Sequence, residues 1–269
     1  MRTALAFLAL SGADALNVVD VGAFSASKLL PFENKDAFFV SPPYYCGVFD
    51  GVSQCPQSRS FAVTLAKTSC AALSGSRPSG EIMEQMQPVL WNALGQAQDY
   101  SGCSTACLVR LDLQQEQPQV SCLNLGDSTC MVLRPSEGAG ALTVADVTVP
   151  KLHSSGAPYQ FGGLKWKTDK TEDAETFCYD VGSGDVVLCY SDGVSNNVKP
   201  DEIAAIVNEC RGAPAQEMAQ RLVETARQRK IVDDDATLVA MRIGEGSGPT
   251  APMLSDEAPW EKVGLRLFG

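Results

Sequence analysis

The order of the predicted elements places this chain in the α+β class, with helices that cover antiparallel sheets. Two apolar strands come first, and two helices, a run of strands, two more helices and a last strand follow them. The chain has 269 residues and no visible internal repeat, which is enough for one large domain or two small ones. Its hydrophobic content of 45% and charged content of 20% exclude disordered, collagen-like and coiled-coil proteins.

The first half of the chain begins with two short strands. Residues 38–40 and 47–49 are apolar runs that flank the Pro42-Pro43 turn, and each is short enough for a buried strand. Apolar residues then recur at helical spacing over residues 60–73 and 81–97. This pattern predicts a strand pair followed by a helix pair.

The middle of the chain reads as an antiparallel meander. Strands are predicted at residues 106–113, 120–125 and 130–134, and Gly126-Asp127-Ser128 is predicted to join the last two as a hairpin turn. The remaining predicted elements are two strands, two helices and a last strand, at residues 177–179, 185–190, 200–210, 214–229 and 237–243.

Charge and histidine content narrow the classes of binding site. Lys and Arg number 21 against 32 Asp and Glu, a formal net charge of −11, which argues against a nucleic-acid-binding surface. His153 is the single histidine, so zinc sites built from two or three histidines are excluded. Any metal ion is therefore expected to be held by carboxylates.

The ten cysteines are interpreted as reduced thiols. They make up less than about 4% of the chain, below the 8–10% that is typical of disulfide scaffolds. Most of them lie inside apolar runs, where cysteine behaves as a small buried hydrophobic residue. Cys103 and Cys107 have CxxxC spacing, but no second pair completes a zinc site.

The two ends differ in composition from the centre. Residues 1–17 are a candidate targeting segment, because one arginine precedes a short apolar stretch and Ala13-Asp14-Ala15 resembles a cleavage site; the alternative is a plain first strand. Residues 244–269 begin with a Gly- and Pro-rich run typical of a flexible tail. The folded domain is thus expected to span residues 18–243. No apolar run reaches the length of a membrane span.

Three aspartates share one local context. Asp50 and Asp192 each follow an apolar strand, and Asp234 precedes one. An Asp-Gly pair is commonly a hairpin turn, but Asp50-Gly51 and Asp192-Gly193 each lead towards a helix. Carboxylates gathered at strand ends are suited to hard divalent cations such as Mg²⁺ or Mn²⁺.

Five short motifs follow one another along the chain. They are Val48-Phe49-Asp50-Gly51-Val52, Gly102-Cys103-Ser104-Thr105-Ala106, Leu125-Gly126-Asp127-Ser128, Ser191-Asp192-Gly193-Val194-Ser195-Asn196-Asn197 and Asp234-Asp235-Ala236-Thr237. In the same order they resemble motifs of the metal-dependent type 2C Ser/Thr protein phosphatases. The match extends over roughly residues 18–243, and His153 with Pro158-Tyr159-Gln160 is similar to the branch that has members in mitochondria and plastids.

The resemblance implies a fold and an activity. The fold is an α/β/β/α four-layer sandwich, with two central antiparallel sheets flanked by helices and a metal site at one end. The activity is hydrolysis of phosphoserine and phosphothreonine by water that two Mg²⁺ or Mn²⁺ ions activate. The implied partner is a phosphoprotein substrate, with no nucleic acid, and the chain is expected to be a monomer. The implied compartment is an organelle, a mitochondrion or plastid, with the cytoplasm as the alternative.

The resemblance also implies roles for particular residues. Asp50 matches the carboxylate that bridges both ions, and Gly51 would offer its backbone carbonyl oxygen. Asp192 and Asp234 match ligands of the metal ion on the other side. Asp36 matches the second acid of the family's Glu-Asp pair and would act through water. Asp50, Asp192 and Asp234 are thus the expected catalytic residues.

Asp127 lies in the Gly-Asp-Ser motif and is expected to orient water near the site. His153 has two interpretations, a general acid or a structural hydrogen-bond partner.

The chain also departs from the family pattern. Lys35 stands where the family commonly has an acid, Ser53-Gln54 replaces a Gly-Gly pair, and Val52 occupies the position of the family's proposed general-acid histidine. These changes leave two functions open. One is an active phosphatase, and the other is a pseudophosphatase that acts as a binding or regulatory module with an impaired metal site.

Overall fold

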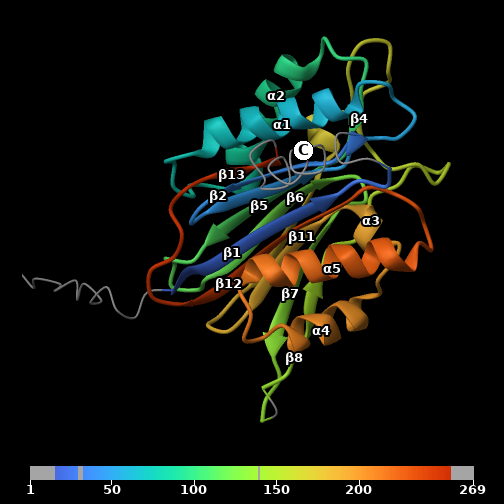
Figure 1. The fold of residues 1–269 in the computed structure, drawn as a ribbon. Helices are drawn as coiled ribbons and strands as arrows, with labels where there is room; N and C mark the ends of the chain where they lie inside the picture. Colours follow the sequence, from blue (N-terminus) through green and yellow to red (C-terminus); the bar gives the residue numbers. More distant parts are fainter. Residues whose placement is uncertain (1–15, 30–32, 139, 256–269) are drawn as a thin grey trace, which may run out of the picture.

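The computed structural model describes residues 16–29, 33–138 and 140–255, and these form four layers (Figure 1). Two antiparallel sheets lie face to face in the centre, and a helix pair covers the outer face of each sheet. The predicted α+β class and the four-layer sandwich are confirmed.

The first sheet has six strands and lies under α1 (Ser58–Leu73) and α2 (Ile82–Ala97). Each neighbouring pair of its strands is antiparallel. In spatial order the strands are β10 (Glu175–Asp180), β6 (Gln119–Leu125), β5 (Ala106–Asp112), β3 (Tyr45–Phe49), β2 (Ala37–Ser41) and β13 (Met253–Leu254).

The second sheet has five strands and is covered by α4 (Pro200–Glu209) and α5 (Ala215–Arg229). In spatial order its strands are β1 (Leu16–Ala26), β12 (Ala236–Glu245), β11 (Val186–Tyr190), β7 (Thr129–Pro135) and β8 (Leu142–Val147). The small elements are β4 (Cys103–Ser104) paired with β9 (Phe161–Gly162), the short helix α3 (Asp192–Ser195) and the 3₁₀ turn η2 (Thr171–Asp173).

Apolar side chains fill all three interfaces between the layers. Phe61 and Leu65 of α1 are fully buried against the first sheet, and Met218 and Leu222 of α5 are fully buried against the second. Burial of each such side chain stabilises the fold by about 1.5–3 kcal/mol. The central strands β3 and β11 are buried along their whole length, so their ends are held rigidly.

The space between the two sheets contains several thiols. Cys107 Sγ lies 3.5 Å from both Cys122 Sγ and Cys189 Sγ, and all three side chains are fully buried. No disulfide joins the ten cysteines, in agreement with the interpretation from composition.

The predicted hairpin at Gly126-Asp127-Ser128 is wrong. β6 and β7 lie in different sheets, and β7 pairs with β11 and β8 rather than with β6. Gly126 has φ +111, and a Cβ there would lie 2.7 Å from both the Thr105 side chain and the Tyr159 carbonyl oxygen. The turn residues therefore carry the chain from one sheet to the other, which places Asp127 at the end of the sandwich.

The ordered fold extends past the expected boundary at Ile243. β12 continues to Glu245, and β13 pairs with β2. Ser255 Oγ donates a hydrogen bond to the Phe38 carbonyl oxygen at 3.0 Å. The candidate targeting segment lies outside the described residues up to position 15, and β1 begins at Leu16. The predicted tail lies outside them from position 256.

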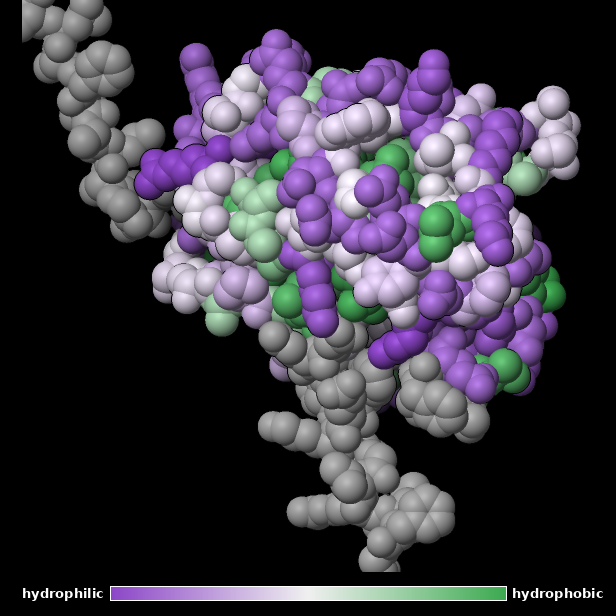
Figure 2. All heavy atoms as spheres, turned by 90° about the horizontal axis from the view of Figure 1, so that it is seen from above, coloured by the Kyte–Doolittle hydropathy of each residue, from purple (hydrophilic) through white to green (hydrophobic). Residues whose placement is uncertain are grey.

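The outer surface over α1 and α2 is mainly hydrophilic, with hydrophobic side chains visible only as small separate spots (Figure 2). No helix within the described ranges combines the length and the apolar character needed to cross a membrane.

Candidate metal centre

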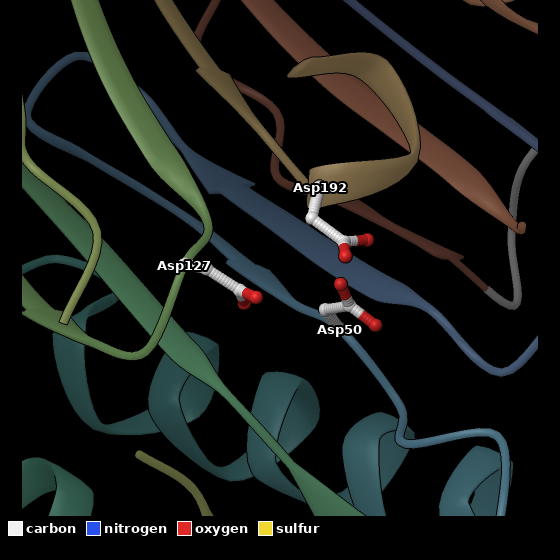
Figure 3. Close-up of side chains that lie close together, drawn as sticks. All are labelled: Asp50, Asp127 and Asp192. Atoms are coloured by element: carbon white, nitrogen blue, oxygen red, sulfur yellow. The ribbon is translucent and has the colours of Figure 1, made fainter. Parts of the chain in front are cut away.

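Three carboxylates from separate parts of the chain meet at one end of the sandwich (Figure 3). Asp50 follows β3, Asp127 lies between β6 and β7, and Asp192 is the first residue of α3. One carboxylate oxygen from each lies within 4.8 Å of the others, and all three residues are half-buried. Their side chains point towards one another.

Backbone contacts position Asp50 at the end of its strand. Its carbonyl oxygen accepts a hydrogen bond from the Thr105 N–H at 2.9 Å, and Thr105 Oγ1 accepts one from the Asp50 N–H at 3.3 Å. Thr105 Oγ1 also lies 3.0 Å from Ser128 Oγ, beside Asp127. A single threonine thus links the segments that carry two of the carboxylates.

Both Asp-Gly motifs need glycine because another backbone approaches closely. A Cβ on Gly51 would lie 2.2 Å from the Lys35 carbonyl oxygen, and a Cβ on Gly193 would lie 1.8 Å from the Asp235 carbonyl oxygen. No side chain fits at these distances. The glycine in each motif therefore serves close packing rather than a hairpin.

Asp192 has a local partner for only one of its oxygens. Asn196 Nδ2 donates to Asp192 Oδ2 at 2.9 Å, whereas Asp192 Oδ1 is buried and has no hydrogen-bond partner among the described residues. Asp127 Oδ1 is likewise buried without a partner in this part of the chain. Buried carboxylate oxygens without donors are costly.

Burial and mutual repulsion raise the pKa values of the clustered carboxylates. Burial first, and then the charges of Asp36 and Asp192, raise the pKa of Asp50 well above its ordinary range. Burial raises the pKa of Asp192, and the charge of Asp234 adds to this effect. Burial and the charge of Asp192 raise the pKa of Asp127 to about 7. A divalent cation would remove this repulsion, and an all-oxygen donor set suits Mg²⁺ or Mn²⁺.

Asp234 lies beside the cluster and has a cation from the chain itself. Lys28 Nζ donates to Asp234 Oδ1 at 2.7 Å and also to Ser53 Oγ. Burial opposes the charged form of Lys28, but the hydrogen bond and charge of Asp234 outweigh it and raise the lysine pKa. The charge of Asp234 is thus close enough to raise the pKa values of Asp192 and Asp127, although Asp234 is itself paired with the Lys28 ammonium group.

Asp36 lies behind the cluster and is 2% exposed. Its Oδ2 accepts a hydrogen bond from Ser191 Oγ at 2.7 Å, and Ser191 directly precedes Asp192. Burial and the charge of Asp235 raise the pKa of Asp36 above its ordinary value. Its position connects β2 to the residue that begins α3.

Two residues that lie beside the metal centre, Asp235 and Lys28, received no predicted role from the sequence. Asp235 is buried, and its carboxylate accepts the backbone N–H groups of Lys28 at 2.7 Å and Lys35 at 2.9 Å. The acidic run at residues 233–235 was visible, but nothing in it separates Asp235 from its neighbours. Lys28 carried no sequence signal, because its partner Asp234 is 206 positions away.

The two departures at Lys35 and Ser53 lie in contact. Lys35 Nζ donates to the Ser53 carbonyl oxygen at 2.6 Å, and Lys28 Nζ donates to the Ser53 hydroxyl. Two ammonium groups therefore meet at the residue that replaces a family glycine. At this edge of the site the carboxylate of Asp234 is paired with an ammonium group, whereas Asp50, Asp127 and Asp192 face one another without one.

The contacts of His153 favour its structural interpretation. Its Nε2 lies 3.0 Å from Asp169 Oδ2, and its ring stacks on Tyr159 with 3.9 Å between ring centroids. The same loop contacts the site through the Lys151 N–H, which donates to the Gly126 carbonyl oxygen at 2.7 Å.

Comparison with protein families gives one match that covers most of the domain. Residues 56–244 match the family described as Stage II sporulation protein E (SpoIIE).

Curated relatives are protein phosphatases. The chain is 28% identical over 189 residues to "Probable protein phosphatase 2C 62" of Arabidopsis thaliana, which covers 68% of this chain and 24% of that protein. It is 30% identical over 151 residues to "Protein phosphatase PTC7 homolog fig" of Drosophila grimshawi, covering 52% and 47%. The chain thus spans about a quarter to a half of the length of the curated relatives it matches.

Solved structures share the fold. The photosystem II phosphatase PBCP superposes with a TM-score of 0.67 at 21% identity, covering 82% of this chain and 97% of that one. The catalytic domain of the Ser/Thr phosphatase PstP, solved with two manganese ions, superposes with a TM-score of 0.64 at 17% identity, covering 86% and 100%. The chain thus resembles the type 2C (PPM) protein phosphatases, and the match over residues 56–244 shows that it belongs to the SpoIIE family.

Proposed function

We propose that this chain is a metal-dependent phosphatase that hydrolyses phosphoserine and phosphothreonine in proteins. The observation that carries the proposal is the group of Asp50, Asp127 and Asp192, whose oxygens lie within 4.8 Å of one another. Two of these residues have a buried oxygen without a partner among the described residues. The family membership supports the same activity.

The proposed ligands are those implied by the resemblance, with Asp127 added on its position. Asp50 would bridge two Mg²⁺ or Mn²⁺ ions, Gly51 would offer its carbonyl oxygen, and Asp192 and Asp234 would complete one side. Asp36 would act from behind through water. Such a pair of ions lowers the pKa of bound water and offsets charge on the phosphate oxygens.

The chain's own residues would orient the substrate. The anionic group at Asp50, Asp127 and Asp192 repels a phosphate unless cations are bound. Lys28 Nζ is 2.7 Å from Asp234 and its side chain is 19% exposed, so it can exchange Asp234 for a phosphate oxygen at the rim. Thr105 would keep Asp50 in place, because its Oγ1 accepts a hydrogen bond from the Asp50 N–H. Asn196 would keep Asp192 in place, because its Nδ2 donates to Asp192 Oδ2.

A pseudophosphatase is the second candidate, and the Lys28–Asp234 ion pair favours it. If Lys28 stays on Asp234, that carboxylate is not available to a metal ion. Lys35 adds a second ammonium group on the same edge, where it contacts Ser53. The chain would then retain the fold and a reduced metal site.

Activity assays separate the two candidates. We expect Mn²⁺-dependent hydrolysis of p-nitrophenyl phosphate and of a phosphothreonine peptide, and we expect EDTA and Asp192→Asn to abolish it. Asp99→Asn is the matched control, because Asp99 is exposed. Absence of turnover with every metal tested, in a protein that binds Mn²⁺ by calorimetry, would instead support the pseudophosphatase.

We also propose an organelle, a mitochondrion or plastid, as the compartment, on the resemblance at His153 and Pro158-Tyr159-Gln160. Imaging of the full chain fused at its C-terminus to a fluorescent protein tests this, and diffuse cytoplasmic signal would reject it. Light scattering after size exclusion tests the proposed monomer.

A further inference from the structure

Cys55 and Cys103 form the closest thiol pair that the structure describes. Their Sγ atoms are 2.8 Å apart, compared with 3.5 Å for the Cys107–Cys122 pair between the sheets. Both side chains are buried, at 1% and 0% exposure. The pair belongs neither to the metal centre nor to the core between the two sheets.

The backbones that carry the two thiols are already joined. The Val52 N–H donates to the Cys103 carbonyl oxygen at 3.0 Å, and Gly51 forms a β-bridge with Ser104. The Cys55 N–H in turn donates to the Val52 carbonyl oxygen at 3.1 Å. Because a disulfide requires nearby backbones, little rearrangement is needed to bring these sulfurs to a bond length of about 2.05 Å.

Access differs between this pair and the other close thiols. Cys55 lies in a turn between Gln54 and Pro56, both of which are exposed. Cys107 and Cys122 instead lie on paired strands in the centre of the sandwich. Local opening of a surface turn requires much less free energy than opening of a central sheet, so an oxidant in solution reaches Cys55 first.

We propose that Cys55 and Cys103 are a reversible modification site, at which a peroxide or a low-molecular-weight disulfide forms an intrachain disulfide that changes the metal centre. With hydrogen peroxide, the Cys55 thiolate attacks one oxygen, the O–O bond breaks, and a sulfenic acid and water result. The Cys103 sulfur then attacks the Cys55 sulfur, and the S–S bond forms as a second water leaves. The two thiols lose two protons and two electrons, which the peroxide takes up.

The order of these steps follows from the environment of Cys103. Burial raises the pKa of the Cys103 thiol, and the adjacent Cys55 adds to this effect. The thiolate is the reactive species, so Cys103 is the poorer first nucleophile and serves as the resolving thiol.

The bond is expected to alter the metal centre because Cys55 is two residues from Ser53. Ser53 accepts hydrogen bonds from Lys28 and Lys35, and its hydroxyl lies 3.5 Å from Asp234 Oδ1. Shortening the sulfur separation from 2.8 Å to about 2.05 Å draws this turn towards β4 and moves Gly51 and Ser53 with it. Loss of such outer contacts weakens metal binding by about tenfold.

Peptide mapping of the full chain tests the bond directly. After treatment with hydrogen peroxide or oxidised glutathione, mass spectrometry is expected to find a peptide that links Cys55 to Cys103 and lacks two hydrogens. Dithiothreitol should separate it. Persistent alkylation of both thiols after oxidation, or linkage of Cys55 to another cysteine, would overturn the proposal.

Variants and metal binding test the consequence. We expect oxidation to weaken Mn²⁺ binding about tenfold in calorimetry, with reversal by dithiothreitol and no effect in Cys55→Ser. Cys178→Ser is the matched control, since Cys178 is exposed and should leave the response intact. If Cys55→Ser fails to fold, differential alkylation of the unmodified chain still reports the bond. Unchanged Mn²⁺ affinity despite a complete linkage would reject the effect on the metal centre.

The effect on turnover rests on the proposed phosphatase activity, whereas the bond and the Mn²⁺ affinity do not. A protein that forms the linkage, changes its Mn²⁺ affinity on reduction and shows no turnover even when reduced and saturated with Mn²⁺ supports this inference and rejects the phosphatase. An enzyme that is active but never forms the linkage supports the phosphatase and rejects this inference.

Discussion

The two ends of β11 carry aspartates in opposite electrostatic surroundings. Asp185 precedes the strand and is 2% exposed, and its Oδ2 accepts hydrogen bonds from Arg134 Nε at 3.1 Å and Nη2 at 2.9 Å. Asp192 follows the strand at its other end and forms no ion pair with a residue in the described ranges. It faces Asp50 and Asp127 instead.

The difference shows where the balancing charge must come from. A buried carboxylate is stable only with donors or a cation nearby. At Asp185 the chain supplies the cation, so that end of the sandwich is complete by itself. At Asp192 the chain supplies further carboxylates, so the cation has to come from solution.

The largest expected effect is the opposite response of the two ends to the same Asp→Asn change. Asp192→Asn should lower Mn²⁺-dependent turnover at least 100-fold, because a proposed metal ligand is lost, without lowering the unfolding free energy of the metal-free protein. Asp185→Asn should lower that free energy by about 2 kcal/mol, because Arg134 loses its carboxylate, and should retain turnover. Kinetics and urea denaturation measure both. Equal destabilisation by the two changes would contradict the comparison.

Substitution of one glycine at each end of the sandwich tests the same difference between the Asp192 end and the Asp185 end by steric crowding. Gly51→Ala should weaken Mn²⁺ binding about tenfold or more, because the new Cβ would lie 2.2 Å from the Lys35 carbonyl oxygen. Gly182→Ala, at the Asp185 end, is the matched control, since a Cβ there meets nothing within 4 Å. Calorimetric titration with Mn²⁺ provides the measurement. Wild-type affinity in Gly51→Ala would show that this loop tolerates a side chain and does not position a ligand.

The metal-free protein should become less stable as the pH rises from about 5 to 7. The pKa of Asp127 is raised to about 7, so in this interval the folded state holds a proton that the unfolded chain, with an ordinary pKa near 4, has released. Stability is therefore highest below the unfolded pKa, falls by about 2 kcal/mol through this interval, and levels off above the folded pKa.

Thermal unfolding at several pH values with EDTA measures this slope. Saturating Mn²⁺ should raise the melting temperature most at the higher pH, because protons compete with the metal ion. Asp127→Asn should reduce the slope of unfolding free energy against pH in the metal-free protein, and the raised pKa values of Asp36 and Asp50 should account for the slope that remains. An unchanged slope in that variant would assign the proton elsewhere.

The smallest expected effect concerns Lys28, which supplies a cation at the edge of the anionic end. Lys28→Met should strengthen Mn²⁺ binding about fivefold, or about 1 kcal/mol, because Asp234 is released from its ion pair. The same change should raise the KM for a phosphopeptide if the ammonium group contacts phosphate. Lys170→Met is the control, since Lys170 is exposed. Weaker Mn²⁺ binding in Lys28→Met would mean that Lys28 supports the metal site rather than competing with it.

Local patterns predicted most of the elements. The helices expected at residues 60–73 and 81–97 are observed as Ser58–Leu73 and Ile82–Ala97, because apolar spacing determines which face of a helix can be buried. The meander was predicted only in part. Gly126-Asp127-Ser128 has the composition of a hairpin turn, but pairing of β7 with β11 draws the chain into the other sheet.

The residues of the candidate site also differ in how well the sequence predicted them. Asp50 and Asp192 could be selected from their motifs, and Asp127 was expected near them. In the structure, the carboxylate oxygens of these three residues lie within 4.8 Å of one another, close enough to bind one metal ion. The pairing of Asp234 with Lys28 could not be predicted, because no pattern links residues 206 positions apart.

Short-range spacing and residue type were enough to predict the layered class, the strand ends that carry acids, and the family. Which acids receive a cation from the chain, and which thiols touch, became visible in the folded molecule alone. Those outcomes depend on how strands that are distant in the sequence pack together. Packing brings the carboxylates of Asp50, Asp127 and Asp192 close together in a half-buried place, where a bound cation would offset their repulsion.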